Sequence, residues 1–180
     1  PTICRNESTV IRAIPGGGSN NYVSYTWTSV PPGFTSSAAE PAVSPLITTV
    51  YKVVVSDGFN EVEGETTVTV NQLPFINLVP DDPKVQPISA TEIGVCVFDT
   101  VTIDAGNPVA LYLWSNGETS RSIDVLSSGI ISDSRQYSVN VTNPVNGCEN
   151  SADITVVFKF DYCSYGISEM ESDDRLVVFP

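Results

Sequence analysis

The second half of the chain repeats the pattern of the first half, and this internal repeat limits the folds open to the chain. Aligning Cys4 with Cys96 brings strand-like alternations in the two halves into register. From Tyr51 onward the offset is a constant 86 residues, with Tyr51 on Tyr137. Four patterns match in the same order: Thr9-Ile11-Ala13 with Val101-Ile103-Ala105, Tyr25-Trp27 with Tyr112-Trp114, Tyr51-Val53-Val55 with Tyr137-Val139-Val141, and Val68-Val70 with Ile154-Val156.

Composition indicates that the repeated element is built from β-strands. The chain has 25 valines but only 7 leucines and 1 methionine. β-branched side chains pack well on a pleated surface, whereas helices favour unbranched ones. Residues two apart on a strand share a face, so each aromatic pair points one way, into a core. Tyr25, Trp27, Tyr112 and Trp114 are therefore the predicted core aromatics.

The repeat predicts two all-β modules in tandem, each an antiparallel sandwich with a buried tryptophan on a central strand. The first module spans 1–73 and the second spans 74–160, with a proline-rich linker or insertion at about 79–95. Residues 161–180 differ from both repeats. They contain an acidic stretch and then Leu176-Val177-Val178-Phe179-Pro180, which reads as the start of a further strand.

Charge and residue usage exclude several classes of function. Lys and Arg total 8 against 21 Asp and Glu, for a net charge of -13, which repels nucleic acid and anionic lipid. Histidine is absent, which excludes catalytic sites and zinc sites that depend on it. No apolar run reaches the roughly 18 residues of a membrane span. The chain is expected to act without catalysis and without a cofactor.

The stretch from Cys96 to Cys148 carries a family resemblance. Its motifs Thr100-Val101-Thr102-Ile103-Asp104, Tyr112-Leu113-Trp114-Ser115-Asn116-Gly117 and Tyr137-Ser138-Val139-Asn140-Val141 resemble the PKD/Ig-like repeats of secreted Bacteroidetes surface proteins. Residues 1–73 look like a longer-looped relative. Gly166-Ile167, Glu169 and Leu176 to Pro180 are similar to the entry into a type IX secretion sorting domain. The resemblance implies tandem immunoglobulin-like (PKD-like) modules, secreted to the bacterial outer cell surface.

Four cysteines in an exported protein favour disulfide bonds, and four allow three pairings. In the repeat alignment Cys148 falls on Val62, so the first repeat has no cysteine at that position. This alignment predicts Cys96–Cys148 as a bond contained within the second module. Cys4 and Cys163 begin the first module and follow the second, so they are expected to be too far apart for the ~5.5 Å Cα spacing of a disulfide.

The acidic residues leave two interpretations open. Asp57, Asp81 and Asp82 are candidate calcium ligands near the junction of the modules, because Ca²⁺ prefers carboxylate oxygens, or they are plain turn and linker acids. Glu61, Glu63 and Glu65 alternate and therefore share one face, which the sequence favours as a solvated acidic surface rather than a catalytic pair.

Two non-catalytic functions fit these features. The first is a spacer or adhesin-type stalk of a cell-surface protein exported by type IX secretion. The second is a carbohydrate-binding accessory module of a polysaccharide-degrading enzyme. The expected partners are other domains of the same longer protein, the type IX secretion machinery, and a surface glycan or another surface protein.

Overall fold

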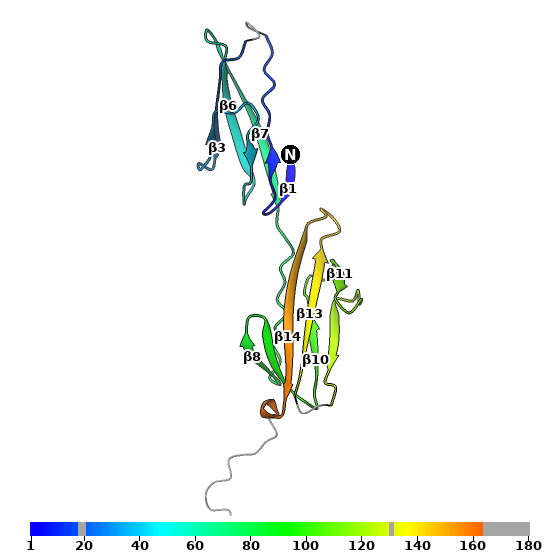
Figure 1. Ribbon diagram of the computed structural model, residues 1–180. Coiled ribbons are helices and arrows are strands. Elements are labelled where there is room, and N and C mark those ends of the chain that lie inside the picture. Colours follow the sequence, from blue (N-terminus) through cyan, green and yellow to red (C-terminus); the bar gives the residue numbers. More distant parts are fainter. Residues whose placement is uncertain (18–20, 130–131, 164–180) are drawn as a thin grey trace, which may run out of the picture. The chain divides into compact units, whose positions relative to one another are not determined.

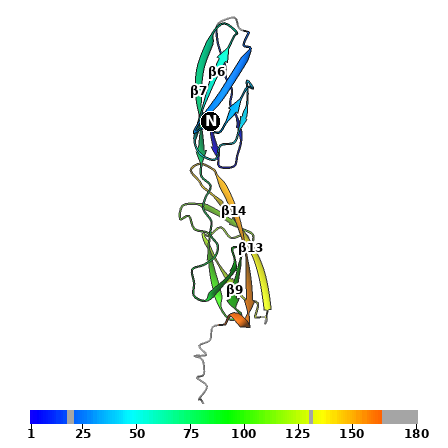
Figure 2. The same cartoon turned by 90° about the vertical axis from the view of Figure 1, so that its left-hand side faces the viewer.

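The structure is a computed structural model that describes residues 1–17, 21–129 and 132–163. It is all-β, which confirms the fold class expected from composition. The acidic stretch and the strand pattern predicted after residue 163 lie outside the described residues. Figures 1 and 2 show the ribbon from two directions at right angles.

The chain divides into two compact units. Unit 1 comprises Pro1–Leu73 together with Val145–Cys148, and unit 2 comprises Pro74–Pro144 and Glu149–Pro180. The division falls between Leu73 and Pro74. The predicted domain limits had placed 145–148 in the second module, whereas these four residues group with unit 1.

Unit 1 is a sandwich of a five-stranded sheet in the order β1-β7-β6-β3-β4 and a two-stranded sheet of β2 and β5. Strand β1 runs parallel to β7, and the other pairs are antiparallel. The strands are β1 (Thr2–Cys4), β2 (Thr9–Val10), β3 (Ser24–Val30), β4 (Thr35–Ser36), β5 (Ala42–Val43), β6 (Thr49–Ser56) and β7 (Glu61–Asn71).

The core of unit 1 forms where alternate side chains of these strands face inward. Along β6, Tyr51, Val53 and Val55 are buried at every second position, as the period of a strand requires. Other core members come from both sheets, so the two sheets pack face to face. The buried set is Ile3, Ile11, Trp27, Val43, Tyr51, Val53, Val55, Val68 and Val70.

Unit 2 repeats this design with a five-stranded sheet in the order β11-β13-β14-β9-β8 and a two-stranded sheet of β10 and β12. Here β9 runs parallel to β14, as β1 does to β7. The strands are β8 (Val85–Ser89), β9 (Glu92–Cys96), β10 (Thr100–Asp104), β11 (Leu111–Trp114), β12 (Ser122–Leu126), β13 (Ser132–Thr142) and β14 (Glu149–Lys159), followed by the 3-10 helix η1 (Phe160–Tyr162).

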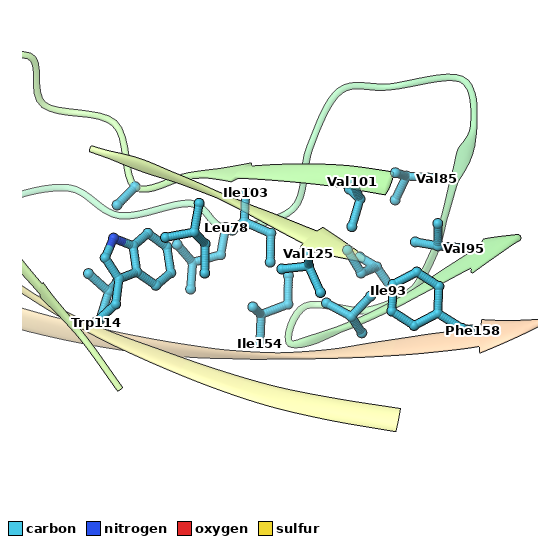
Figure 3. Close-up of a cluster of buried hydrophobic side chains, with 14 of the residues drawn as sticks. Leu78, Val85, Ile93, Val95, Val101, Ile103, Trp114, Val125, Ile154 and Phe158 are labelled. Carbon is cyan, nitrogen blue, oxygen red and sulfur yellow. The ribbon is translucent and has the colours of Figure 1, made fainter. Parts of the chain in front are cut away.

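Each unit has the buried tryptophan and two-sheet core of an immunoglobulin-like sandwich. The core of unit 2 is shown in Figure 3. It is made of Leu78, Val85, Ile93, Val95, Val97, Val101, Ile103, Ala105, Trp114, Ile123, Val125, Val139, Val141, Ile154, Val156 and Phe158.

The structural correspondence between β7 and β14, the last strands of the two units, differs from the one that the gapless sequence alignment predicts. The connection after β6 has four residues, 57–60, whereas the one after β13 has six, 143–148. Val68 therefore corresponds to Val156, and the predicted match of Val68 to Ile154 is wrong by two residues. A shift of two keeps every side chain on the same face, so the apolar alternation is the same in both registers.

The predicted linker or insertion at about 79–95 is also partly wrong. Strands β8 and β9 form a hairpin there, and Val85, Ile93 and Val95 join the core of unit 2. Prolines suggested an irregular segment, but Pro87 lies on β8, the edge strand, where a missing N–H removes no ladder bond.

Candidate functional site

The two tryptophans occupy equivalent core positions. Trp27 on β3 lies opposite Val53, and Trp114 on β11 lies opposite Val139. Val139 follows Val53 by 86 residues, the offset of the repeat. Their exposed fractions are 1% and 2%. Each indole Nε1 donates to a backbone oxygen, that of Ala38 at 2.9 Å for Trp27 and that of Ser120 at 2.8 Å for Trp114. Rings held in this way are core residues and offer no face to a sugar.

The paired tyrosines are half-buried at the margins of the two cores. Tyr25 packs against the core of unit 1 and Tyr112 against that of unit 2. The Tyr112 hydroxyl donates to the backbone oxygens of the turn at Gly106 and Asn107. Burial is the largest influence on Tyr112 and raises the pKa of its hydroxyl. Tyr112 thus fixes the turn that follows β10.

The predicted Cys96–Cys148 disulfide is wrong. The bonds are Cys4–Cys148, with Cα atoms 5.6 Å apart, and Cys96–Cys163, with Cα atoms 4.4 Å apart. Cys96 pairs with Lys159 at the end of β14, whereas Cys148 directly precedes the start of that strand. Eleven residues at about 3.3 Å each separate the two ends by roughly 36 Å, which no disulfide spans.

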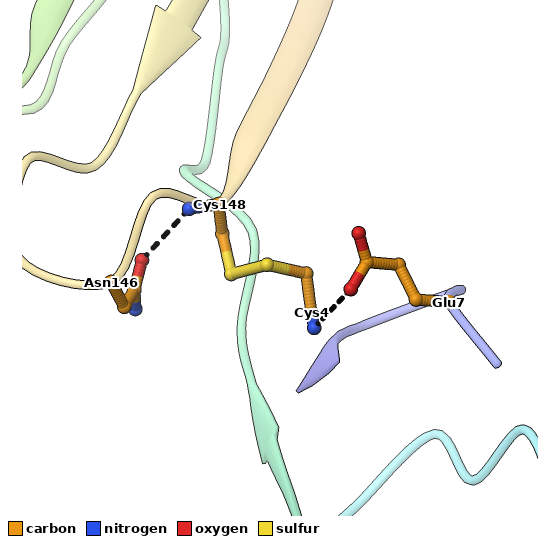
Figure 4. Close-up of a disulfide and its surroundings, with 4 residues drawn as sticks. All are labelled: Cys4, Glu7, Asn146 and Cys148. Atoms are coloured by element: carbon orange, nitrogen blue, oxygen red, sulfur yellow. Dashed lines mark hydrogen bonds between the residues drawn. A yellow bond between two sulfur atoms is a disulfide. The ribbon is translucent and has the colours of Figure 1, made fainter. Parts of the chain in front are cut away.

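Local structure brings each pair of cysteines together. After β14, η1 turns the chain back, and Tyr162 packs over Gly94, where a Cβ would lie 2.8 Å from the tyrosine ring. This packing requires glycine and brings Cys163 to Cys96. At the other bond, the backbone N–H of Cys4 donates to Glu7 and that of Cys148 to Asn146 (Figure 4).

The alignment of Cys4 with Cys96 agrees with the turns that follow them. Each cysteine is the last residue of the strand that runs parallel to the final strand of its unit. The backbone oxygen of Cys4 accepts the N–H of Glu7, and that of Cys96 accepts the N–H of Asp99. Each donor lies three residues after the cysteine, at 3.0 Å. The first half-cystine of each repeat was therefore matched at its structural equivalent, and the second was not.

Two of the three candidate calcium ligands accept hydrogen bonds from nearby backbone N–H groups. The Asp57 carboxylate accepts the backbone N–H groups of Phe59 and Asn60, and the Asp82 carboxylate accepts that of Lys84. Within the described residues no group of three or more Asp, Glu, Cys or His forms a metal-binding cluster. Asp57, Asp81 and Asp82 are thus not brought together into a ligand set.

In the part of the chain that the structure describes, one edge of unit 1 has backbone groups with no strand beside them. Strand β7 pairs with β6 over residues 61–68, but with β1 only over 69–71. The Thr69 N–H donates to Pro1 and the Asn71 carbonyl accepts from Arg5, so odd-numbered residues direct both backbone groups to this side. Among the described residues, no strand pairs with the outward N–H and C=O groups of Glu61, Glu63, Glu65 and Thr67. We call these four residues the open edge.

A cavity of about 280 Å³ adjoins the open edge. It is lined by Trp27, Val53, Val55 and Val62 of the sheet, and also by residues 12–16. Gly64 faces this space without a side chain, and Val62 beside it is 52% exposed. The cavity therefore has a mixed lining, with apolar side chains beside the charged Arg12, Glu63 and Glu65.

The equivalent place in unit 2 is filled by the chain itself. Leu78, 5% exposed, belongs to the core of unit 2 and lies beside Trp114 in Figure 3. The Asn150 side chain donates to the Pro74 carbonyl at 2.8 Å, and that of Asn107 donates to the Phe75 carbonyl. Asn150 corresponds to Val62, which lines the cavity of unit 1. Residues 74–78 thus occupy, in unit 2, the place that corresponds to the cavity of unit 1.

Sequence reasoning identified the acidic alternation of Glu61, Glu63 and Glu65 but missed the cavity beside it. The available signal was Gly64, because a glycine inside a strand often marks a close approach of another chain. Within the described residues there is no helix long and apolar enough to cross a membrane.

Comparison with known proteins gives no family. No family model matches the chain, and no curated protein does. Solved structures with tandem β-sandwich domains are similar at low identity. The Dpr2 Ig1-Ig2 complex with DIP-Theta Ig1-Ig3 is 14% identical with a TM-score of 0.36, covering 86% of this chain and 60% of that chain. The Clostridium thermocellum CbhA fibronectin(III)-like modules are 11% identical with a TM-score of 0.36, covering 88% of each chain.

The I-band fragment I67-I69 from titin is 13% identical with a TM-score of 0.43, covering 88% of this chain and 62% of that one. This chain therefore spans less than two thirds of the titin fragment and of the Dpr2 complex chain. None of these three likenesses reaches a TM-score of 0.5, so none indicates a function for this chain.

Proposed function

We propose that this chain is a non-catalytic spacer, a stalk segment of an exported cell-surface protein that resists extension under tension. The observation that carries the proposal is the covalent connectivity of the two disulfides. Tension entering at Cys4 crosses to Cys148, and from Cys148 it passes along β14 to Cys163. Between Cys4 and Cys163 it therefore bypasses residues 5–147 and passes along a single core strand, β14.

Chain lengths give the size of this effect. A fully extended residue spans about 3.5 Å, so the 15 residues from Cys148 to Cys163 reach about 53 Å. Without disulfides the 159 residues from Cys4 to Cys163 would reach about 560 Å. Moreover, β14 supplies most of the short path, and a strand is already close to full extension.

The parallel pairing of β1 with β7 and of β9 with β14 supports the same role. In a chain whose disulfides are reduced, tension on β9 and β14 slides the two strands past each other, so the hydrogen bonds between them are loaded together. The same holds for β1 and β7 in unit 1, over three paired residues.

Two disulfides in one chain favour an oxidising compartment, which supports export. The type IX route rests on the resemblance of residues 166–180 to a sorting-domain entry, and these residues lie outside the described part. A carbohydrate-binding role is not proposed, because both tryptophans are buried.

Single-molecule pulling between handles at Pro1 and Pro180 tests the spacer proposal. We expect the oxidised chain to release tens of ångströms of contour length and the reduced chain several hundred. Two double variants make the test specific. Cys96→Ser with Cys163→Ser keeps the Cys4–Cys148 path and stays short, whereas Cys4→Ser with Cys148→Ser frees the 92 residues from Cys4 to Cys96, about 320 Å. Equal extension of the two variants would contradict the proposed path.

A further inference from the structure

We propose that Asn146 is a site of spontaneous deamidation, at which the exposed Asn146-Gly147 pair converts by way of a succinimide into aspartate and isoaspartate. The site lies two residues before Cys148, in the loop whose cysteine bonds to Cys4. The co-reactant is water. The inference is independent of the spacer proposal, since it concerns the covalent chemistry of one loop and needs no tension.

The reaction begins at the backbone nitrogen of Gly147. This nitrogen gives up its proton to a base from the solvent and attacks the side-chain carbon Cγ of Asn146, so that a new C–N bond closes a five-membered ring. The Nδ2 group takes up a proton and leaves as ammonia. Water then opens the ring at one of its two carbonyl carbons. Opening at Cγ gives aspartate, whereas opening at the main-chain carbon gives isoaspartate, whose backbone runs through the former side chain.

The chain contains a second Asn-Gly pair, Asn116-Gly117, which provides an internal comparison. Both pairs are exposed, so water reaches each of them. In both, the asparagine Oδ1 accepts the N–H of the residue two positions later, Glu118 at 3.1 Å and Cys148 at 3.0 Å (Figure 4). The φ of the glycine is positive in both, +88° and +74°. Exposure, residue type and local turn therefore do not distinguish the two sites.

The Asn116-Gly117 turn is held at both reacting groups. The Gly117 N–H donates to the backbone oxygen of Trp114 at 2.9 Å, which holds the proton that the attack has to remove. The Asn116 Nδ2, the group that leaves as ammonia, donates to the Glu118 carboxylate at 3.0 Å. Trp114 is 2% exposed, so the turn is attached to the core of unit 2. Succinimide formation at Asn116 therefore has to break both hydrogen bonds.

The Asn146-Gly147 pair differs at both reacting groups. Within the part of the chain that the structure describes, neither the Gly147 N–H nor the Asn146 Nδ2 has a hydrogen-bond partner. Beyond the neighbouring residues, no atom lies within 4 Å of the place that a Cβ of Gly147 would take. Val145, just before the pair, is 91% exposed. Exposed loops change conformation more readily than packed turns, and glycine offers no Cβ to obstruct the approach to Cγ.

Deamidation changes the loop that presents Cys148 to Cys4. It adds one negative charge to a chain whose net charge is -13, because a carboxyl with a pKa of about 3.9 is ionised at neutral pH. Isoaspartate also inserts one methylene into the backbone before Gly147. The former Cγ carbonyl, which accepts the Cys148 N–H, then becomes part of the main chain. The modification therefore acts directly on the support of a half-cystine that is 1% exposed.

Incubation of the oxidised chain at mildly alkaline pH tests the proposal, because base speeds the loss of the glycine proton. Samples are digested over time, and mass spectrometry follows the peptides that contain Asn146 and Asn116. We expect the Asn146 peptide to gain one dalton at least tenfold faster than the Asn116 peptide. It should also accept methyl groups from S-adenosylmethionine through an isoaspartyl methyltransferase. Equal rates, or a faster gain at Asn116, would overturn the proposal.

Denaturation separates the effect of the fold from that of the local sequence. In the reduced, denatured chain both pairs lose their hydrogen bonds, so we expect their rates to come within a few-fold of each other. A tenfold difference that persists under these conditions would show that sequence alone sets the rates, contrary to the proposal.

Matched substitutions assign the reaction to one residue. Asn146→Ser keeps an oxygen that accepts the Cys148 N–H but has no amide to lose, so the mass gain and the methyl acceptance should both disappear. Asn116→Ser is the control and should leave the rate at Asn146 unchanged. Peptide mapping checks that both variants keep the Cys4–Cys148 bond. A mass gain that persists in the Asn146→Ser peptide would place the reaction at another residue and refute the assignment.

Discussion

Cys96 and Cys148 lie at opposite ends of β14, although the repeat alignment places them as a pair. Each instead bonds to a cysteine close to its own end of that strand, Cys163 and Cys4. Peptide mapping without reduction should therefore yield Cys4 linked to Cys148 and Cys96 linked to Cys163. A peptide joining Cys96 to Cys148 would contradict the structure.

Reduction should destabilise both units. Chain entropy predicts about 5 kcal/mol for the bond with a sequence separation of 144 and about 4 kcal/mol for the one with 67. Calorimetry with and without reductant measures the effect, and Cys4→Ser with Cys148→Ser isolates the first bond. A reductant that lowers the melting temperature of only one unit would contradict this prediction.

Leu78→Ala should open in unit 2 the kind of cavity that unit 1 already has. Because Leu78 is 5% exposed and packed in the core, its truncation should cost about 2–4 kcal/mol of unfolding free energy. Denaturant unfolding measures this cost. Phe75→Ala is the matched control, since Phe75 is 79% exposed, and it should change stability by less than about 0.5 kcal/mol.

Gly64→Val should stabilise unit 1. A Cβ at Gly64 meets only Val53, at an ordinary 3.7 Å, and valine favours a strand over glycine by about 1 kcal/mol. The same change at Gly117, where φ is +88°, should be destabilising because side chains rarely adopt that conformation. Thermal melts of the two variants that shift in the same direction would contradict this prediction.

Asp104 should contribute an acid-sensitive interaction across β10 and β12. The Arg121 side chain donates to the Asp104 carboxylate at 2.8 Å and lowers its pKa. A lowered pKa in the folded state stabilises above the unfolded value of about 3.9, and this is lost as pH falls through the folded value. The pair is about half exposed, so the effect is small. Asp104→Asn should be less stable than the wild type at pH 7, and that difference should vanish in strong acid.

The elements that could be predicted are those that depend on alternation and on residue type. Valine-rich alternation indicated strands, and the spacing of Tyr25 with Trp27 and of Tyr112 with Trp114 indicated matching central strands. The register of β14 could not be obtained in this way, because a two-residue insertion in a turn changes no residue's face.

The remaining differences depend on tertiary neighbours. Pro87 is compatible with a strand only because β8 is at an edge, and edge position is a property of the assembled sheet. The place of residues 74–78 against the core of unit 2 likewise depends on contacts with distant residues such as Asn107 and Asn150. Local sequence contains neither fact.

The order of the four cysteines along the chain also determines how the protein responds to proteases. The two disulfide-closed rings overlap, because Cys96 lies between Cys4 and Cys148 while Cys163 lies beyond both. A single cleavage at any peptide bond between Cys4 and Cys163 therefore leaves both products joined by at least one disulfide. An extracellular protease can nick any one loop of this region without separating the residues before Cys4 from the residues after Cys163.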